Sequence, residues 1–196
     1  MTLTELRYDF PAATPETWHK HRNGGGWVEN TAWVDATAKV GSNAIVWGNA
    51  RVLDNACVLD YAQVHNNAWV CANAQVCGAA SISDSAVICG DAKVDGNVCV
   101  SGTARVGGTT HLSGLVRVAG DARIVGGEWT TSPLHIQGSS YSLTNAKPGY
   151  IQIGCELHTY KQWLRLGPKL AKEARFTEKE IEEYMAYIHL FQRVGK

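Results

Sequence analysis

The sequence lacks the features that mark several large classes of protein. It has no run of about eighteen apolar residues, so no transmembrane helix is predicted, and Met1 to Glu5 carry no basic stretch followed by an apolar one, so no secretion signal is predicted. The six cysteines include no CxxC pair, which disfavours a structural zinc site. A formal net charge of zero argues against a chain-wide basic surface for nucleic acid. These absences favour a cytoplasmic protein with no membrane partner and no strong nucleic-acid signal.

Common catalytic motifs are also missing. The sequence contains no P-loop, no GxSxG nucleophile motif and no Rossmann fingerprint. Its 20 glycines are distributed as turn residues rather than as a phosphate-binding loop. No cofactor is predicted from this pattern.

What the sequence does contain is an aliphatic residue at every sixth position. Most of these residues are followed four positions later by alanine, and each is followed by a turn pair such as Gly48-Asn49 or Asp54-Asn55. The aliphatic positions are Val28, Val34, Val40, Val46, Val52, Val58, Val64, Val70, Val76, Ile82, Ile88, Val94, Val100, Val106, Leu112, Val118 and Ile124.

This period of six predicts a solenoid. A helix requires a period of 3.6 and an ordinary strand a period of 2, so neither fits one large apolar residue per hexad over about a hundred residues. Short strands that end in Gly, Asn or Asp turns can wind into stacked coils with aliphatic and alanine side chains inside. If three hexads form one triangular coil, residues eighteen apart stack, and about six coils form a prism roughly 27 Å long.

The hexads from Trp27 to Gly127 resemble the hexapeptide-repeat superfamily of left-handed parallel β-helices. The start at Gly24-Gly25-Gly26-Trp27-Val28 and the G-N-A-R-V style of repeat are most similar to the hexapeptide-repeat proteins of phages and prophages. The resemblance implies a triangular all-β solenoid and a homotrimer packed through its faces. A phage origin would imply the host cytoplasm as the place of action.

Segments outside the repeat predict caps. Residues 1–26 form an N-terminal cap, with a short helix from Thr14 to about His21, and residues 27–127 form the β-helix. Residues 128–196 form a β-hairpin within Leu134–Ile153 followed by two helices. The first is expected from Tyr160 to Ala174, with a kink or break at Gly167-Pro168, and the second follows the capping box Thr177-x-x-Glu180. The apolar stripe of the second helix, Ile181 to Phe191, is expected to be core or an oligomer contact.

Two enzyme classes share this predicted fold. An acyltransferase needs a basic histidine beside a cleft between protomers, and only His65 and His111 lie within the repeat, where we expect both at the surface. A γ-class carbonic anhydrase needs three convergent histidines. His19 and His21 lie outside the repeat, and Cys155-Glu156-Leu157-His158 has no partner pair, so no metal site and no catalytic residue are predicted.

One vertical file of outward residues is the candidate site. The residues that precede the inward aliphatics on every third hexad alternate between tryptophan and arginine, which suits cation–π contact between coils, stacking of aromatic ligands and pairing with phosphate. Such residues are also typical of interface cores, so both an oligomer interface and a ligand or partner surface stay open. The predicted binding residues are Trp33, Arg51, Trp69, Arg105 and Arg123, with Val87 between them.

The sequence therefore predicts a non-enzymatic, oligomeric binding protein. Its partners would be itself, as a homotrimer, and a host protein or a small nucleotide-like ligand, with inhibition of a host or defence pathway as the role if it is phage-encoded. A hexapeptide-type acyltransferase that uses His65 or His111 as its base, and a structural particle component, are the alternatives. Cys71 and Cys89, eighteen residues apart, should stack as reduced thiols.

Overall fold

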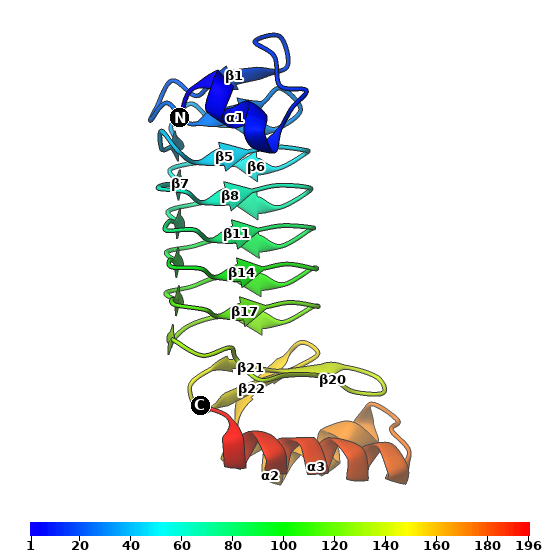
Figure 1. Ribbon diagram of the computed structural model, residues 1–196. Coiled ribbons are helices and arrows are strands. Elements are labelled where there is room, and N and C mark those ends of the chain that lie inside the picture. Colours follow the sequence, from blue (N-terminus) through cyan, green and yellow to red (C-terminus); the bar gives the residue numbers. More distant parts are fainter.

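The computed structural model describes residues 1–196 as a parallel β-solenoid of about six coils with a cap at each end (Figure 1). The N-terminal cap lies above the first coil. The C-terminal module lies below the last coil, with its sheet facing the solenoid and its two helices on the far side of that sheet (Figure 1).

Three parallel sheets form the faces of the prism. Each coil contributes one strand to each sheet, and most strands contain two residues, because the turn residues on either side end them. The first face contains β2 (Trp27–Glu29), β5 (Ile45–Val46), β8 (Gln63–Val64), β11 (Ser81–Ile82), β14 (Cys99–Val100) and β17 (Arg117–Val118). The second contains β3 (Trp33–Val34), β6 (Arg51–Val52), β9 (Trp69–Val70), β12 (Val87–Ile88), β15 (Arg105–Val106) and β18 (Arg123–Ile124). The third contains β4 (Lys39–Val40), β7 (Cys57–Val58), β10 (Gln75–Val76), β13 (Lys93–Val94), β16 (His111–Leu112) and β19 (Glu128–Trp129).

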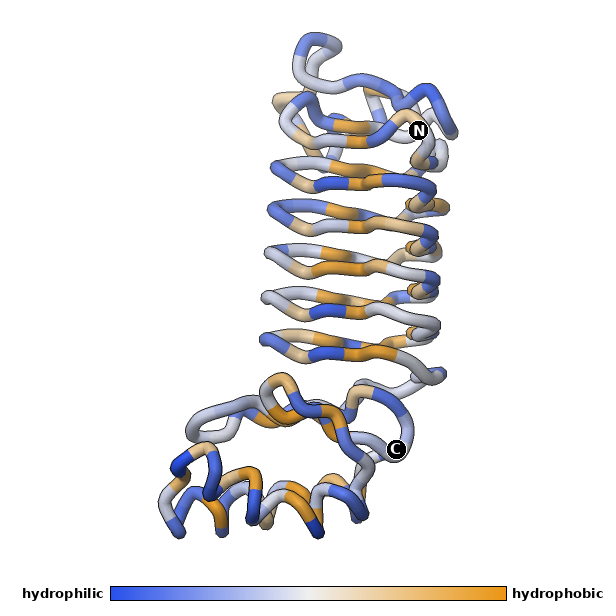
Figure 2. Tube along the Cα trace, turned by 180° about the vertical axis from the view of Figure 1, so that it is seen from behind, coloured by the Kyte–Doolittle hydropathy of each residue, from blue (hydrophilic) through white to orange (hydrophobic).

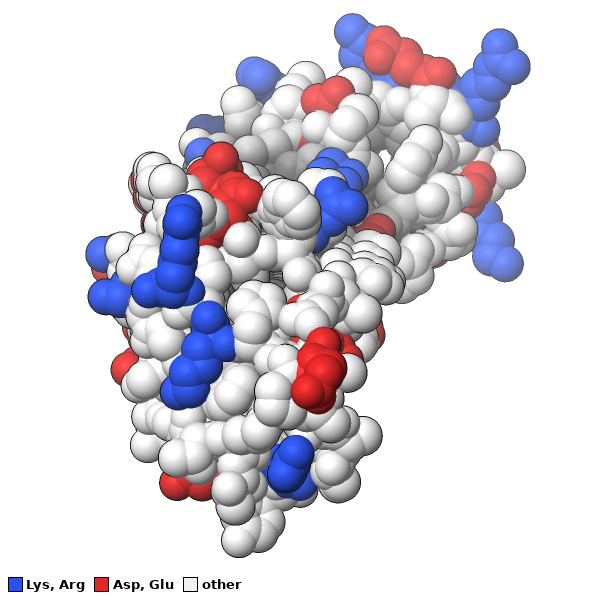
Figure 3. All heavy atoms as spheres, turned by 90° about the horizontal axis from the view of Figure 1, so that it is seen from above, with Lys and Arg blue, Asp and Glu red and all other residues white.

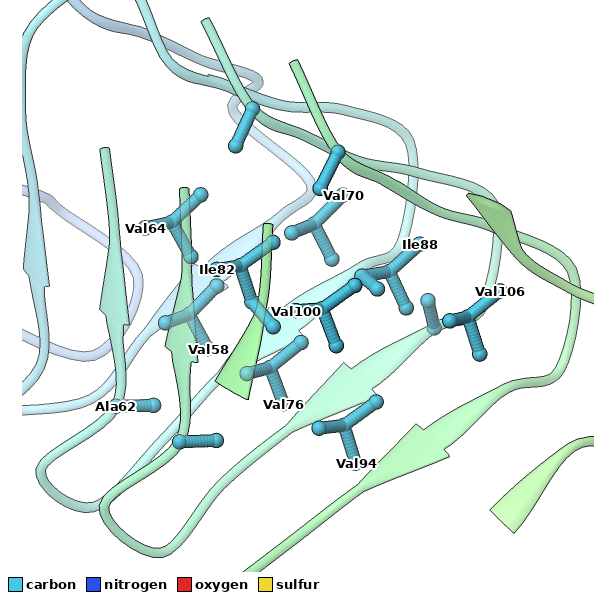
Figure 4. Close-up of a cluster of buried hydrophobic side chains, with 14 of the residues drawn as sticks. Val58, Ala62, Val64, Val70, Val76, Ile82, Ile88, Val94, Val100 and Val106 are labelled. Atoms are coloured by element: carbon cyan, nitrogen blue, oxygen red, sulfur yellow. The ribbon is translucent and has the colours of Figure 1, made fainter. Parts of the chain in front are cut away.

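The core consists of the predicted aliphatic and alanine positions. Every predicted aliphatic except Val34 is buried, and Val34 is only partly covered, at the N-terminal end. Hydrophobic segments recur at the same place in successive coils (Figure 2), and the valines and isoleucines of the three faces point toward one another (Figure 4). Strand partners differ by eighteen residues along each face, as Val52, Val70 and Ile88 do, up to the last pair of the third face, where Leu112 pairs with Trp129. This spacing confirms the six-residue register.

The corners require left-handed backbone. Asp54, Asp60, Asn66, Ala72 and Asp84 have positive φ angles of 55° to 59°, and glycines occupy the equivalent corners of other coils. The corner carboxylates accept hydrogen bonds from the next coil. Examples are the bonds from the backbone N–H of Gly78 to Asp60 Oδ2, at 3.0 Å, and from Gly102 to Asp84 Oδ2, at 2.9 Å. Turn chemistry therefore fixes the stacking as well as the bends.

The N-terminal cap differs from the prediction. The prediction of a helix at Thr14–His21 is wrong. The cap helix is α1 (Leu3–Asp9), which begins at a capping box between Thr2 and Glu5. Thr14–Thr17 forms a single turn, and β1 (Trp18–Lys20) pairs antiparallel with β2. Pairing the exposed edge of the first coil satisfies backbone groups that a helix there would leave open, so tertiary pairing outweighs the local helix signal.

The C-terminal module is larger than a hairpin. Its four-stranded antiparallel sheet contains β20 (His135–Gln137), β21 (Ser142–Lys147), β22 (Tyr150–Ile153) and β23 (Glu156–Thr159). The predicted hairpin is its central pair, β21–β22, with a turn at Pro148-Gly149.

Helices α2 (Tyr160–Glu173) and α3 (Glu178–Val194) cover one side of this sheet, and both begin at capping boxes. The predicted break in α2 does not occur, since the helix continues through Pro168. The apolar stripe of α3 contributes Tyr184, Ile188 and Phe191 to the core of the module. No helix is both long and apolar enough to span a bilayer.

Candidate functional site

The Trp/Arg face is the surface of the second sheet, formed by the first residue of each of its strands. Because the second residue of each strand points into the core, the first points to solvent, and parallel pairing places these first residues directly above one another. The paired series is Trp33, Arg51, Trp69, Val87, Arg105 and Arg123. The file predicted from the eighteen-residue spacing is therefore present as a geometric feature.

This face holds the exposed tryptophans of the molecule. Trp33 is 64% exposed and Trp69 is 40% exposed. Of the other five tryptophans, Trp18, Trp27 and Trp163 are buried in or against the caps, Trp129 is buried in the solenoid core, and Trp47 is half-buried against the N-terminal cap. An exposed indole is a large apolar surface left in water, so two of them on one file mark this face as different from the other two.

The upper half of the file is pre-ordered by its own contacts. The guanidinium carbon of Arg51 lies 4.9 Å from the centre of the Trp69 ring, within cation–π range. The indole N–H of Trp33 donates to Asp35 Oδ1 at 2.9 Å. The backbone N–H of Asp54 and the Trp33 indole both donate to Asp35 and lower the pKa of that carboxyl. The rings are thus held by side chains of the same face.

The lower half of the file is basic and unpaired. Arg105 and Arg123 are exposed partners on adjacent strands, and no carboxylate oxygen lies within 4.0 Å of either guanidinium. Like charges directly opposite on neighbouring strands repel, and an anion bound between them would relieve that repulsion. Arg123 also borders a polar hollow of about 230 Å³ at the junction with the C-terminal sheet, which Asp121, Gln137 and Gln152 help to line.

The first face is covered where its aromatic residues lie. Trp27, Ile45 and the neighbouring Trp47 pack with Phe10 of the N-terminal cap, and the ring centres of Phe10 and Trp47 are 5.0 Å apart. These tryptophans, which the sequence left without a role, serve the cap. The third face presents Lys39, Cys57, Gln75, Lys93 and His111 and has no exposed large hydrophobic side chain in its file. Seen from the N-terminal end, charges of both signs are dispersed among uncharged atoms (Figure 3).

The repeat histidines lie apart from the Trp/Arg face. His65 stacks on Trp47, with ring centres 4.3 Å apart and planes 6° from parallel, and its Nε2 lies 3.4 Å from Ser81 Oγ. His111 Nε2 lies 2.6 Å from Asp95 Oδ2 on the third face. The two histidines therefore do not share a site. No three His, Cys, Asp or Glu side chains converge as a group of metal ligands.

The cysteines that the solenoid buries have low reactivity. All six cysteines are free thiols. Burial, followed by the interaction with the adjacent Cys89, raises the pKa of Cys71 to about 12, and burial also raises the pKa of Cys77. A raised pKa keeps these groups as thiols rather than reactive thiolates, in agreement with a packing role.

Sequence reasoning missed a cavity in the C-terminal module. It lies between the β22–β23 turn and the helices α2 and α3, and it is lined mainly by apolar side chains. The stripe on α3 was visible in the sequence, but a stripe does not reveal whether the facing helix fills the space beside it. Small residues on the facing helix, Gly167 and Ala171, were the available signal.

Comparison with known proteins adds no assignment: no family model, curated protein or solved structure matches this chain.

Proposed function

We propose that the protein is a non-enzymatic binding protein and that the Trp/Arg face is its contact surface. The observation that carries this proposal is that the chain has seven tryptophans and leaves two exposed, Trp33 and Trp69, on one file of one face. Burial in a cap or core accounts for most of the others. A partner that covers this file would remove the exposed indole surface from water.

The residue types support a macromolecular contact. Tryptophan and arginine are enriched among residues whose truncation costs about 2 kcal/mol or more in binding. The file runs along a flat sheet over six coils, and flat faces suit another protein surface better than they suit a small ligand, which needs a concave site. The first partner that we propose is another copy of the chain, in the homotrimer that the resemblance to the hexapeptide-repeat superfamily implies.

The unpaired arginines support an anionic partner group beside that contact. Arg105 and Arg123 offer two guanidinium forks at one coil spacing, which suits a phosphate or carboxylate. A nucleotide-like ligand in the groove between protomers would stack its base on Trp69 and pair its phosphate with these arginines. The hexad style further supports membership of the hexapeptide-repeat superfamily and a phage origin, in which the protein acts in the host cytoplasm by binding a host protein or such a ligand.

Native mass spectrometry of freshly purified protein tests this proposal, because it reports oligomer mass and retained ligand together. The test variant is Trp69→Ala with Arg105→Ala, and the matched control is Gln75→Ala with Lys93→Ala on the third face. We expect trimer mass for wild type and control and monomer for the test variant. An intact trimer with a lost ligand mass assigns the file to ligand binding. If all three proteins have the same masses and bound species, the site assignment is wrong.

An acyltransferase is a second candidate because of one contact. The 2.6 Å bond between His111 Nε2 and Asp95 is the kind of carboxylate contact that orients a catalytic histidine. A general base contributes about a hundredfold or more to rate. Acetyl transfer from acetyl-CoA to a panel of small acceptors, with His111→Ala and His65→Ala as variants, decides between the functions. We expect no turnover above background, and histidine-dependent turnover would replace the binding proposal.

A further inference from the structure

The C-terminal module contains an apolar cavity of about 270 Å³. It opens between the β22–β23 turn and the helices α2 and α3, and twelve of its fifteen lining residues are hydrophobic. Trp163, Leu170, Phe176, Met185 and Ile188 form much of its wall. None of the residues of the Trp/Arg face lines it, so it is a separate feature.

Gly167 keeps part of this space open. The residue lies inside α2 and is buried, and glycine inside a helix is unfavourable relative to alanine. A Cβ atom at this position would lie 3.5 Å from Met185 Sδ and 3.6 Å from Ile188 Cδ1, which are ordinary contact distances. Packing therefore does not require the glycine, and its effect is to leave volume unfilled. Protein interiors are close-packed, and voids larger than a water molecule are few.

The lining determines the charge of a suitable ligand. It contains no lysine, arginine or histidine, and its one charged group, Glu156, is negative. The hydroxyl of Tyr184 is already engaged, since it donates to the carbonyl of Tyr141 at 2.8 Å and accepts from the backbone N–H of Ser140 at 3.0 Å. An anion in this cavity would lose its hydration without gaining a partner, so a neutral apolar molecule is favoured.

The volume determines the size of a suitable ligand. An apolar cavity of about 150 Å³ engineered into another protein stays dry and binds benzene. The cavity here is larger, and it suits a molecule of two fused rings. We propose that the C-terminal module is a binding site for a neutral, compact, apolar small molecule of about that size.

Methyl NMR of the full chain tests this proposal with indole as the probe. The chain has two methionines, Met1 and Met185, so a [¹³C-methyl]methionine label gives two signals. Met185 lines the cavity, whereas Met1 packs at the N-terminal cap and serves as an internal reference. We expect indole to shift the Met185 signal saturably, through the ring current of the bound molecule, and to leave Met1 unmoved. Indole-3-carboxylate should bind at least about tenfold more weakly because of its charge.

Two variants locate the effect. Ala171→Phe places a ring in the cavity and should abolish the Met185 shift, whereas Ala186→Phe makes the same change at an exposed position of α3 and should preserve it. No saturable Met185 shift in the wild type, equal shifts at Met1 and Met185, or equal binding of indole and its carboxylate would each overturn the proposal. The comparison of the two probes uses the wild type alone, so it stands even if Ala171→Phe does not fold.

Discussion

Replacing Val70 with alanine should destabilise the solenoid far more than replacing an exposed surface residue with alanine. Val70 has no exposed surface and is paired between Val52 and Ile88 on the second face. In Figure 4 its side chain points toward those of the other faces. A stack of identical coils cannot move one coil inward without disturbing its neighbours, so the space left by the substitution should stay largely open.

The expected magnitude follows from two contributions. Removing two methylene equivalents from the core costs about 1.6 kcal/mol at about 0.8 kcal/mol each. A residual cavity of roughly 50 Å³ adds about 1.2 kcal/mol at about 24 cal/mol per Å³. We therefore expect Val70→Ala to lower the free energy of unfolding by about 2 to 3 kcal/mol and the Tm by roughly 5 to 10 °C.

Urea unfolding followed by far-UV circular dichroism measures this loss. Gln75→Ala is the matched control, because Gln75 is exposed on β10, the next strand along the chain, and its truncation should cost no more than about 0.5 kcal/mol. Equal m-values would show that the same surface is exposed on unfolding. If Val70→Ala lost less than about 1 kcal/mol, or no more than the control, the inward assignment of the six-residue register would be refuted.

Three further predictions concern glycine, cysteine and pH. Gly78→Ala should cost more stability than Gly149→Ala in thermal unfolding: both have positive φ, but a Cβ at Gly78 would come within 2.6 Å of backbone in the next coil, whereas nothing lies within 4 Å at Gly149. Cys155 should be alkylated by iodoacetamide at pH 8 long before Cys71, measured by peptide mass spectrometry, because a pKa of about 12 leaves roughly one Cys71 in ten thousand as thiolate. Hydrogen bonds from the N-cap of α3 lower the pKa of Glu180, so its contribution to stability is present above its unfolded pKa and lost as the pH falls through the lower folded value. An unfolding series from pH 6 to pH 3 should therefore lose less stability in Glu180→Gln than in the wild type, and parallel losses would contradict this capping role.

Much of the solenoid could be predicted because each hexad repeats the same physical choice. A hexad that is ambiguous by itself is assigned from the hexads on either side. The inward residues, the eighteen-residue pairing and the file from Trp33 to Arg123 therefore followed directly from the spacing. The end of the repeat did not follow: β19 pairs Trp129 with Leu112, a separation of seventeen residues, because a large indole closes the core where no aliphatic continues.

The caps and the site were less accessible because they depend on contacts that occur once. Thr14-Pro15 carries a local helix signal, but the free edge of β2 recruits this part of the chain as strand β1. The sequence could not reveal that Trp27 and Trp47 are covered by the N-terminal cap while Trp33 and Trp69 are not, since that depends on which face the cap crosses. The cavity beside Gly167 likewise depends on how closely two helices approach one another and the sheet.

The most direct test of the proposed contact face is hydroxyl-radical footprinting of the assembled protein. Trp33 and Trp69 are the probes, and Tyr61, which is 66% exposed at a corner of the solenoid, is the internal reference. At equal radical dose, we expect both indoles to be protected in the oligomer or complex relative to the wild-type protein diluted until it dissociates, with Tyr61 oxidised equally in every sample. The double variant Trp69→Ala with Arg105→Ala, which lacks one of the two indoles, serves as a second unassembled reference for Trp33 alone. Equal oxidation of Trp33 and Trp69 in the free and assembled states would contradict the assignment of this face as the contact surface.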